Sequence, residues 1–390
     1  MRRSAATLLL AALAAPTGLA ACSPAPSDPV AATATAPADP VAATGTVTPS
    51  GQPVGGRTGQ PSPTQTGRPD PGPVAAALAL APEDTAYLTV TDWARVKERL
   101  GAAELTSESI QTDRIEFWRA VGASTVLLTD GALRAENSRL GLRYGVTQDD
   151  VVWEVRWAGH ATEDRDGGDD LAAAGTALRL RDDLDLDGLE RAVTDGVAGV
   201  EGAQVLPGER LLLRGAGEPG ATLSRSAAVA AALSEGVETQ VVVPGCLGWP
   251  TALGADADVE DQEAAVGSVE VADLLEPQAW GIAFTGRDAV VRVVYPEGTQ
   301  DPAAVADARA RLELAEGWPT TEPVGWDDAF GLPPGLVGDG FLVTEEGGQV
   351  VVTADYRVVS PGAAATVALA GLVPWAVCSE VDWLPEPTGL

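Results

Sequence analysis

A sharp change of composition near residue 74 is the feature that most limits what this chain can fold into. All 18 aromatic residues of the 390-residue chain follow this point, and the first of them is Tyr87. Residues 23–74 contain 12 prolines and only five charged residues, and Ala, Thr, Ser and Gly fill most of the rest. Such a segment cannot bury enough apolar surface to offset its conformational entropy. We therefore expect a disordered tether over residues 22–74 and a folded domain over residues 75–390.

The segment before the tether has the features of an export signal. A pair of arginines precedes an apolar run, Thr7 to Ala15, that is too short to span a bilayer as a mature helix. The motif Leu19-Ala20-Ala21-Cys22 follows and closely resembles the lipobox of bacterial lipoproteins. The resemblance implies a signal peptide over residues 1–21, cleavage before Cys22 and lipid attachment to its sulfur. An ordinary secretory peptide with a nearby cleavage site is the alternative.

The tether itself resembles the Pro/Ala/Thr-rich spacers of cell-envelope lipoproteins in high-GC Gram-positive bacteria. This resemblance implies a protein held by its lipid on the extracytoplasmic face of the cell membrane. One partner is then the membrane, through the anchor, and the other is an envelope protein or ligand that the sequence does not identify. Nucleic acid is excluded as a partner, because a net charge of −31 would repel its phosphates.

Hydrophobic periodicity in residues 75–390 predicts an α+β fold, with helices packed on antiparallel sheet. In the segment Val151 to Trp157, three apolar residues alternate with Val152, Glu154 and Arg156. One face of this strand should therefore be buried and the other solvent-exposed. Thr125 to Leu128 is expected to be a further short strand.

The order of predicted elements recurs along the folded part. Each half contains strand, strand, helix, strand, strand and helix, and then an apolar segment with a proline and a cysteine. Trp153 and Trp280 stand at corresponding starts, which divides the domain into halves of about 75–246 and 247–390. The pattern favours an internal duplication, and a chance recurrence of a common α+β order is the alternative.

Two cysteines, Cys246 and Cys378, remain if Cys22 is lipidated. An oxidising compartment favours a disulfide between them. Two buried free thiols are the alternative, since both residues lie in apolar runs. Catalysis by either cysteine with His160, the only histidine, has no recognisable sequence signature.

Two further motifs suggest ligands and have simpler explanations. Asp183, Asp185 and Asp187 match the opening of a calcium-binding EF-hand loop, but Thr194 stands where the loop requires Glu. Asp187 with Glu three residues later also reads as a helix capping box without metal. Residues 215–220 match G-x-G-x-x-G, but a glutamate and a proline within the motif oppose phosphate binding, so we expect a turn.

Aromatic and charged residues leave several functional hypotheses open. Four tryptophans are expected in loops, where they either contact a ligand or anchor the core: Trp249, Trp318, Trp326 and Trp383. One histidine and three cysteines exclude multi-histidine and four-cysteine metal sites, and we expect no cofactor. The leading hypothesis is a non-catalytic binding or scaffolding role in the cell envelope. The alternatives are a carboxylate-dependent envelope hydrolase and a carrier with an apolar cavity for a solute or lipid.

Overall fold

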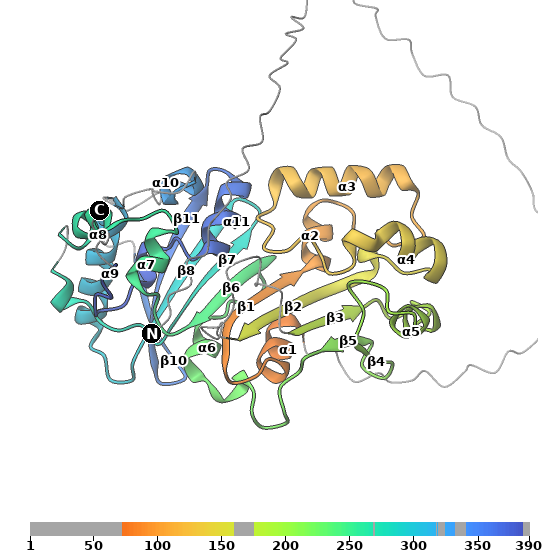
Figure 1. Cartoon of the computed structure of the whole chain (residues 1–390), viewed down its shortest axis with the longest axis horizontal. Helices are drawn as coiled ribbons and strands as arrows, with labels where there is room; N and C mark the ends of the chain where they lie inside the picture. The colour runs from red at the N-terminus through yellow and green to blue at the C-terminus, as the bar shows by residue number, and fades with distance from the viewer. Residues whose placement is uncertain are drawn as a thin grey trace, which may run out of the picture. The chain divides into compact units, whose positions relative to one another are not determined.

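The computed structural model describes residues 72–159, 175–267, 270–316, 318, 324–331 and 341–384. These residues form an α+β fold in which eleven strands make one sheet and helices cover both of its faces (Figure 1). All of the paired strands are antiparallel, which confirms the predicted fold class. Within the described ranges, no helix combines the length and the apolar character needed to cross a membrane.

The strands follow the order β10-β11-β8-β7-β6-β1-β2-β3-β5-β4 across the sheet, and β9 pairs with β11. Their bounds are β1 Thr85–Asp92, β2 Val151–Gly159, β3 Gly175–Leu180, β4 Gln204–Leu206, β5 Leu211–Arg214, β6 Thr239–Pro244, β7 Ala279–Thr285, β8 Asp288–Tyr295, β9 Phe330–Gly331, β10 Leu342–Glu346 and β11 Gln349–Val358.

The α-helices are α1 Gly72–Leu80, α2 Trp93–Arg99, α3 Gln111–Ser124, α4 Asn137–Tyr144, α5 Asp187–Thr194, α6 Ala227–Ala232, α7 Trp249–Leu253, α8 Val259–Val266, α9 Asp301–Glu316, α10 Trp326–Ala329 and α11 Pro361–Ala370. Short 3-10 helices are η1 Arg134–Glu136, η2 Gln148–Asp150, η3 Leu223–Arg225, η4 Val271–Asp273 and η5 Pro374–Ala376.

Helices cover the two faces of the sheet in different numbers. Leu88 and Val90 of β1 pack with α1 and α6 on one face. Because side chains alternate along a strand, Tyr87 and Thr89 point to the opposite face. There, helices α2 to α5 pack over the β1–β5 half, and α9 to α11 pack over the β6–β11 half (Figure 1). Helices α3 and α11 are in contact where the two groups meet, and we call this side the α3/α11 face.

The two halves of the sheet have the same strand order. From the centre outward, one half runs β1-β2-β3-β5-β4 and the other runs β6-β7-β8-β11-β10. Helices α1 and α6 precede β1 and β6 and lie on the same face, whereas α11 lies on the α3/α11 face. A repeated unit would therefore begin at α1 and α6, and not at residue 247. The duplication itself stays a prediction.

Two local expectations differ from the structure. Thr125 to Leu128 forms no strand; instead Val126 is buried, and its carbonyl accepts a hydrogen bond of 2.8 Å from Thr239 Oγ1. Residues 125–128 are therefore held by contacts with the sheet beneath them and not by the strand-to-strand backbone hydrogen bonds that we expected. Helix α1 begins at Gly72, so the folded part starts within the last residues of the expected tether.

A buried ion pair fixes the C-terminal segment to the domain. Arg311 of α9 is 0% exposed, and its Nε donates to the Asp307 carboxylate at 2.6 Å. Its other guanidinium nitrogens donate to the carbonyls of Trp375, Val377 and Leu275 at 2.7–2.9 Å. The guanidinium thus joins α9 to the backbone of the C-terminal segment and of Leu275, and the Asp307 carboxylate balances its charge.

Candidate functional site

A central pocket lies on the α3/α11 face, where the two helix groups meet over β1 and β2. Its volume is about 140 Å³. It is lined by Tyr87, Thr89, Leu128, Arg156, Trp157, Ala158 and Leu369. These residues come from β1, β2, α11 and the segment after α3, so the pocket exists only when both halves of the chain have folded together.

The register of β1 against β2 brings the polar side chains of the pocket together. Thr89 is paired with Arg156, and Tyr87 is paired with Ala158. Residues that are directly opposite, or two apart on one strand, point to the same face of a sheet. The side chains of Tyr87 and Arg156 therefore reach the same side of the sheet, beneath α11.

The Tyr87 hydroxyl is buried and has no hydrogen-bond partner within the described part of the chain. Leaving a buried hydroxyl unpaired costs roughly 1–3 kcal/mol. Burial also raises the pKa of this phenol far above its usual range, so the hydroxyl keeps its proton and can donate a hydrogen bond. The oxygen has almost no accessible surface, so Tyr87 lines the pocket with other atoms and its hydroxyl does not face the open space.

Arg156 brings a positive charge to the same pocket. Its side chain is 29% exposed, and its Nε donates to the carboxylate of Glu154, which is 1% exposed. The two Nη groups of Arg156 make no hydrogen bond with any residue that the structure describes. Two or more guanidinium donors are therefore free to face the cavity.

The Glu154 carboxylate does not depend on Arg156 alone. It also accepts hydrogen bonds of 3.2–3.3 Å from Trp93 Nε1, Gln148 Nε2, Thr129 Oγ1 and the Ala132 amide. The prediction that this face of β2 is exposed to solvent is therefore wrong, because the helices of the α3/α11 face cover it. The Glu154 carboxylate is hydrogen-bonded to protein donors and is not solvated by water.

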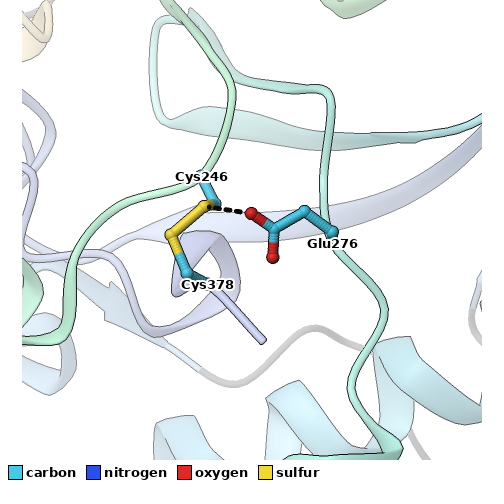
Figure 2. A group of neighbouring side chains, drawn as sticks. All are labelled: Cys246, Glu276 and Cys378. Atoms are coloured by element: carbon cyan, nitrogen blue, oxygen red, sulfur yellow. Dashed lines mark hydrogen bonds between the residues drawn. A yellow bond between two sulfur atoms is a disulfide. The ribbon is translucent and has the colours of Figure 1, made fainter. Parts of the chain in front are cut away.

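The predicted pairing of the two cysteines is present in the structure. Cys246 and Cys378 form a disulfide, with 5.0 Å between their Cα atoms and a sequence separation of 132. Figure 2 shows the Glu276 carboxylate directed at this bond. Glu276 Oε1 lies 2.9 Å from Cys246 Sγ, and its other oxygen accepts from the Ser379 amide and hydroxyl at 2.9 and 2.7 Å.

The disulfide decides what this group can do chemically. Among the residues that the structure describes, Cys246, Glu276 and Cys378 are the one set of acidic, Cys or His side chains whose potential metal ligands all lie within 4.8 Å of one another. Cysteine binds metals as a thiolate, and a half-cystine sulfur is not one. In the oxidised protein this set is therefore a covalent cross-link with an adjacent carboxylate.

The three aspartates that match the opening of a calcium-binding loop do not converge in this way. Asp183 forms an ion pair of 2.7 Å with Arg181, which lowers the pKa of its carboxyl. Asp185 Oδ1 accepts the Asp187 amide at 3.0 Å, next to the start of α5. The N-cap of α5 is Leu186 and has no side-chain cap, so the predicted capping box at Asp187 is wrong. The carboxylate two residues earlier binds this amide instead.

The G-x-G-x-x-G segment is a turn that packs against the start of the domain. The Gly217 amide donates to the Leu80 carbonyl at 2.8 Å, and a Cβ at Gly217 would approach the Pro82 Cα to 2.9 Å. The Trp157 indole donates to the Gly215 carbonyl at 2.9 Å. The 3-10 helix η3, and not an α-helix, follows. These contacts agree with the predicted turn.

The four tryptophans expected in loops divide into two kinds. Trp249 and Trp326 begin helices α7 and α10 and are 0% and 5% exposed, so they anchor the core. Trp318 is half-buried, and its indole donates to the Ala252 carbonyl at 3.2 Å. Trp383 is 52% exposed. Cys22 and His160 lie outside the described residues.

Sequence reasoning did not identify Tyr87 or Arg156 as site residues. A tyrosine in a strand and an arginine on its polar side are ordinary surface patterns. One signal could have singled out Arg156. It follows Glu154 by two residues, so the two opposite charges share one face of a strand whose other face carries Trp153, Val155 and Trp157. The sequence matches no protein-family model, and neither the curated proteins nor the solved structures include a significant match.

Proposed function

We propose that this chain is a lipid-anchored protein of the outer face of the cell membrane, with a non-catalytic role in which the central pocket binds a ligand. The observation that carries the binding role is the central pocket, whose wall includes Arg156 with both Nη groups unpartnered within the described part of the chain. A ligand with acceptor atoms would pair these donors, and its binding would stabilise the folded state.

The anchor and its compartment are supported by the sequence and by the cysteines. The lipobox-like motif ends in Cys22, and the tether after it is long enough to hold the domain away from the membrane surface. A disulfide between cysteines 132 residues apart fits an oxidising compartment outside the cytoplasm.

The non-catalytic role is supported by the way the charged groups at the pocket are used. Glu154, the buried carboxylate that pairs with the pocket residue Arg156, also accepts hydrogen bonds from four neighbouring groups. General acid–base chemistry on a substrate needs a carboxyl group that can reach it and exchange a proton. A carboxylate fully engaged as an acceptor supports the structure of the site instead.

The anchor is tested by metabolic labelling with an alkyne analogue of palmitate in a high-GC Gram-positive host. We expect label on the wild-type protein and none on Cys22→Ser, together with loss of partition into a detergent phase. Label retained in the Cys22→Ser protein would exclude this anchor.

The binding role is tested by native mass spectrometry of protein purified from the same host. We expect a small co-purifying mass that mild denaturation releases. The Leu369→Trp variant, which fills the pocket from α11, should lack this mass. Leu342→Trp is the matched control, since Leu342 is 62% exposed on the edge strand β10. A mass retained by Leu369→Trp would place the ligand elsewhere, and a clean mass for all three proteins would contradict the binding role.

A further inference from the structure

We infer that Cys246, Cys378 and Glu276 form a binding site for a thiophilic divalent cation such as Zn²⁺ when the disulfide is reduced. The inference goes beyond the proposed binding role and does not depend on the central pocket. Three observations support it. The donor atoms converge, the backbone around them is joined by contacts other than the disulfide, and the carboxylate points at a sulfur that gives it no hydrogen bond in the oxidised protein (Figure 2).

The donor atoms of the three side chains are already within reach of one ion. One sulfur from each cysteine and one Glu276 oxygen all lie within 4.8 Å of one another. Zn²⁺ binds thiolates at about 2.3 Å and carboxylate oxygens at about 2.0–2.2 Å, so its tetrahedral ligands are about 3.5–3.8 Å apart. The Cα atoms of the two cysteines are 5.0 Å apart, so rotation of the side chains can separate the sulfurs to this distance without moving the backbone.

Hydrogen bonds hold the three segments that carry these ligands side by side. The Gly245 amide, just before Cys246, donates to the carbonyl two residues after Glu276 at 2.8 Å. The buried Arg311 guanidinium donates to the carbonyls just before Glu276 and just before Cys378, at 2.7 and 2.8 Å. None of these bonds involves the sulfurs. Reduction should therefore leave the two thiols and the carboxylate close together.

The Glu276 carboxylate is oriented toward a partner that the disulfide does not supply. One oxygen accepts from the Ser379 amide and hydroxyl at 2.9 and 2.7 Å, and the other lies 2.9 Å from Cys246 Sγ. A half-cystine sulfur has no proton to donate, and this second oxygen has no other protein partner within the described ranges. Carboxylates that bind metals are commonly held by such hydrogen bonds.

The types of ligand select the cation. Thiolates favour Zn²⁺, whereas Mg²⁺ and Ca²⁺ prefer oxygen ligands. Two thiolates and a carboxylate bring three negative charges together, and a divalent cation compensates two of them. Glu276 is exposed and both cysteines are partly exposed, so the ion can enter and a water molecule can become the fourth ligand.

The dithiol state precedes the disulfide and can follow it. Every chain is synthesised with thiols, and a thiol reductant restores them: two electrons and two protons pass to the disulfide, while two reductant thiols become a disulfide. Zn²⁺ then replaces the two thiol protons, which pass to solvent, and two Zn–S bonds form. Because the same sulfurs form the disulfide or bind the metal, the two states exclude each other.

The experiment uses the full chain with Cys22→Ser, so that the domain supplies the only two cysteines. The protein is reduced with a phosphine, which is then removed, and is dialysed without oxygen against Zn²⁺ in excess Mg²⁺, which occupies exposed carboxylates. We expect one Zn²⁺ per reduced chain and none per oxidised chain. Co²⁺ in place of Zn²⁺ should give the visible absorption of a tetrahedral site and a thiolate charge-transfer band.

Variants of the reduced chain assign the ligands. Cys246→Ser should abolish stoichiometric Zn²⁺ binding, and Glu276→Gln should weaken it by about tenfold or more. Glu380→Gln is the matched control, because Glu380 is also exposed and lies two residues after Cys378 but is outside the three-residue set. It should bind Zn²⁺ as the reduced parent chain does.

Several results would overturn the inference. These are no stoichiometric Zn²⁺ on the reduced chain, equal binding by the oxidised chain, and an affinity of Glu276→Gln equal to that of Glu380→Gln. Near-ultraviolet circular dichroism checks that the reduced chain is folded. If it is not, Zn²⁺ must restore the native spectrum, and failure to do so would also contradict the inference. No readout involves the central pocket, so this site and the proposed binding role can fail separately.

Discussion

Removing the disulfide is the perturbation whose magnitude follows most directly from the structure. The double change Cys246→Ser and Cys378→Ser opens a covalent loop that spans 132 residues. With a loop of this length, the extra entropy of the unfolded chain is about 17 cal/mol/K, or about 5 kcal/mol at 25 °C. This is a large fraction of the 5–15 kcal/mol that stabilises a typical domain.

The native state should survive this change, because other contacts hold the same two segments together. The Leu247 amide donates to the Ala376 carbonyl at 2.6 Å, and the Cys378 amide donates to the Leu247 carbonyl at 2.9 Å. The Trp249 indole adds a bond of 3.1 Å to the Cys378 carbonyl. The loss of stability should therefore arise in the unfolded chain and not from a distorted fold.

The assay is urea unfolding, followed by tryptophan fluorescence and circular dichroism. We expect an unchanged near-ultraviolet spectrum in water, a lower midpoint and a steeper dependence on urea, because the unfolded chain becomes more expanded. The wild type treated with a reductant that is not a thiol is the control and should lose the same free energy. A loss below about 2 kcal/mol, or a native spectrum already altered in water, would refute this reasoning.

Three further predictions concern phenols and charged side chains. Burial raises the pKa of three phenols well above 10. Their contribution to the free energy of unfolding is therefore complete below pH 10. Above pH 10, the free energy of unfolding should fall by about 4 kcal/mol per pH unit for the three phenols together. These are the phenols of Tyr87, Tyr295 and Tyr356. Absorbance at 295 nm should therefore rise together with the loss of circular dichroism. Glu276→Gln should speed reduction of the disulfide by glutathione about fivefold at low salt. The reason is that the change removes about 1 kcal/mol of repulsion between the carboxylate and an attacking thiolate. Alkylation followed by mass spectrometry measures the rate. Arg311→Met should lower the free energy of unfolding in urea by about 3–5 kcal/mol, because the buried Asp307 carboxylate loses its charged partner.

Each of these three has an outcome that would contradict it. Phenolate absorbance from more than one of the four tyrosines near pH 10 in a fully folded protein would mean that the buried phenols are open to solvent, since Tyr144 is the one tyrosine outside this set. An unchanged reduction rate for Glu276→Gln, or a difference that persists in high salt, would exclude the electrostatic explanation. A loss below 1 kcal/mol for Arg311→Met would mean that water or a rearranged side chain replaces the guanidinium.

The sequence predicted the main elements correctly where the apolar period was regular. The predicted strand Val151 to Trp157 lies within β2, and the turn expected over residues 215–220 is present. It predicted poorly where an element depends on distant contacts. Thr125 to Leu128 has the composition of a strand, but the sheet has no free edge beside it, and the segment packs across the strands instead.

The candidate site could not be predicted for the same reason. Tyr87 and Arg156 are 69 positions apart in the chain, and they line the same pocket only because of the register in which β1 pairs with β2. Leu369, from the end of the chain, closes the cavity above them. No local sequence pattern predicts that three segments so far apart in the chain come into contact.

By itself, the amino-acid sequence determined the α+β class and the pairing of the two cysteines of the domain. These follow from composition, periodicity and the small number of cysteines, which are local or countable properties. Only the tertiary structure decided that both faces of the sheet are covered, that Glu154 is buried on the side expected to face solvent, and that a phenol and a guanidinium share one pocket. The physical reason is that burial and hydrogen-bond partners are set by contacts between residues far apart in the chain, and a sequence period defines a face without stating what packs against it.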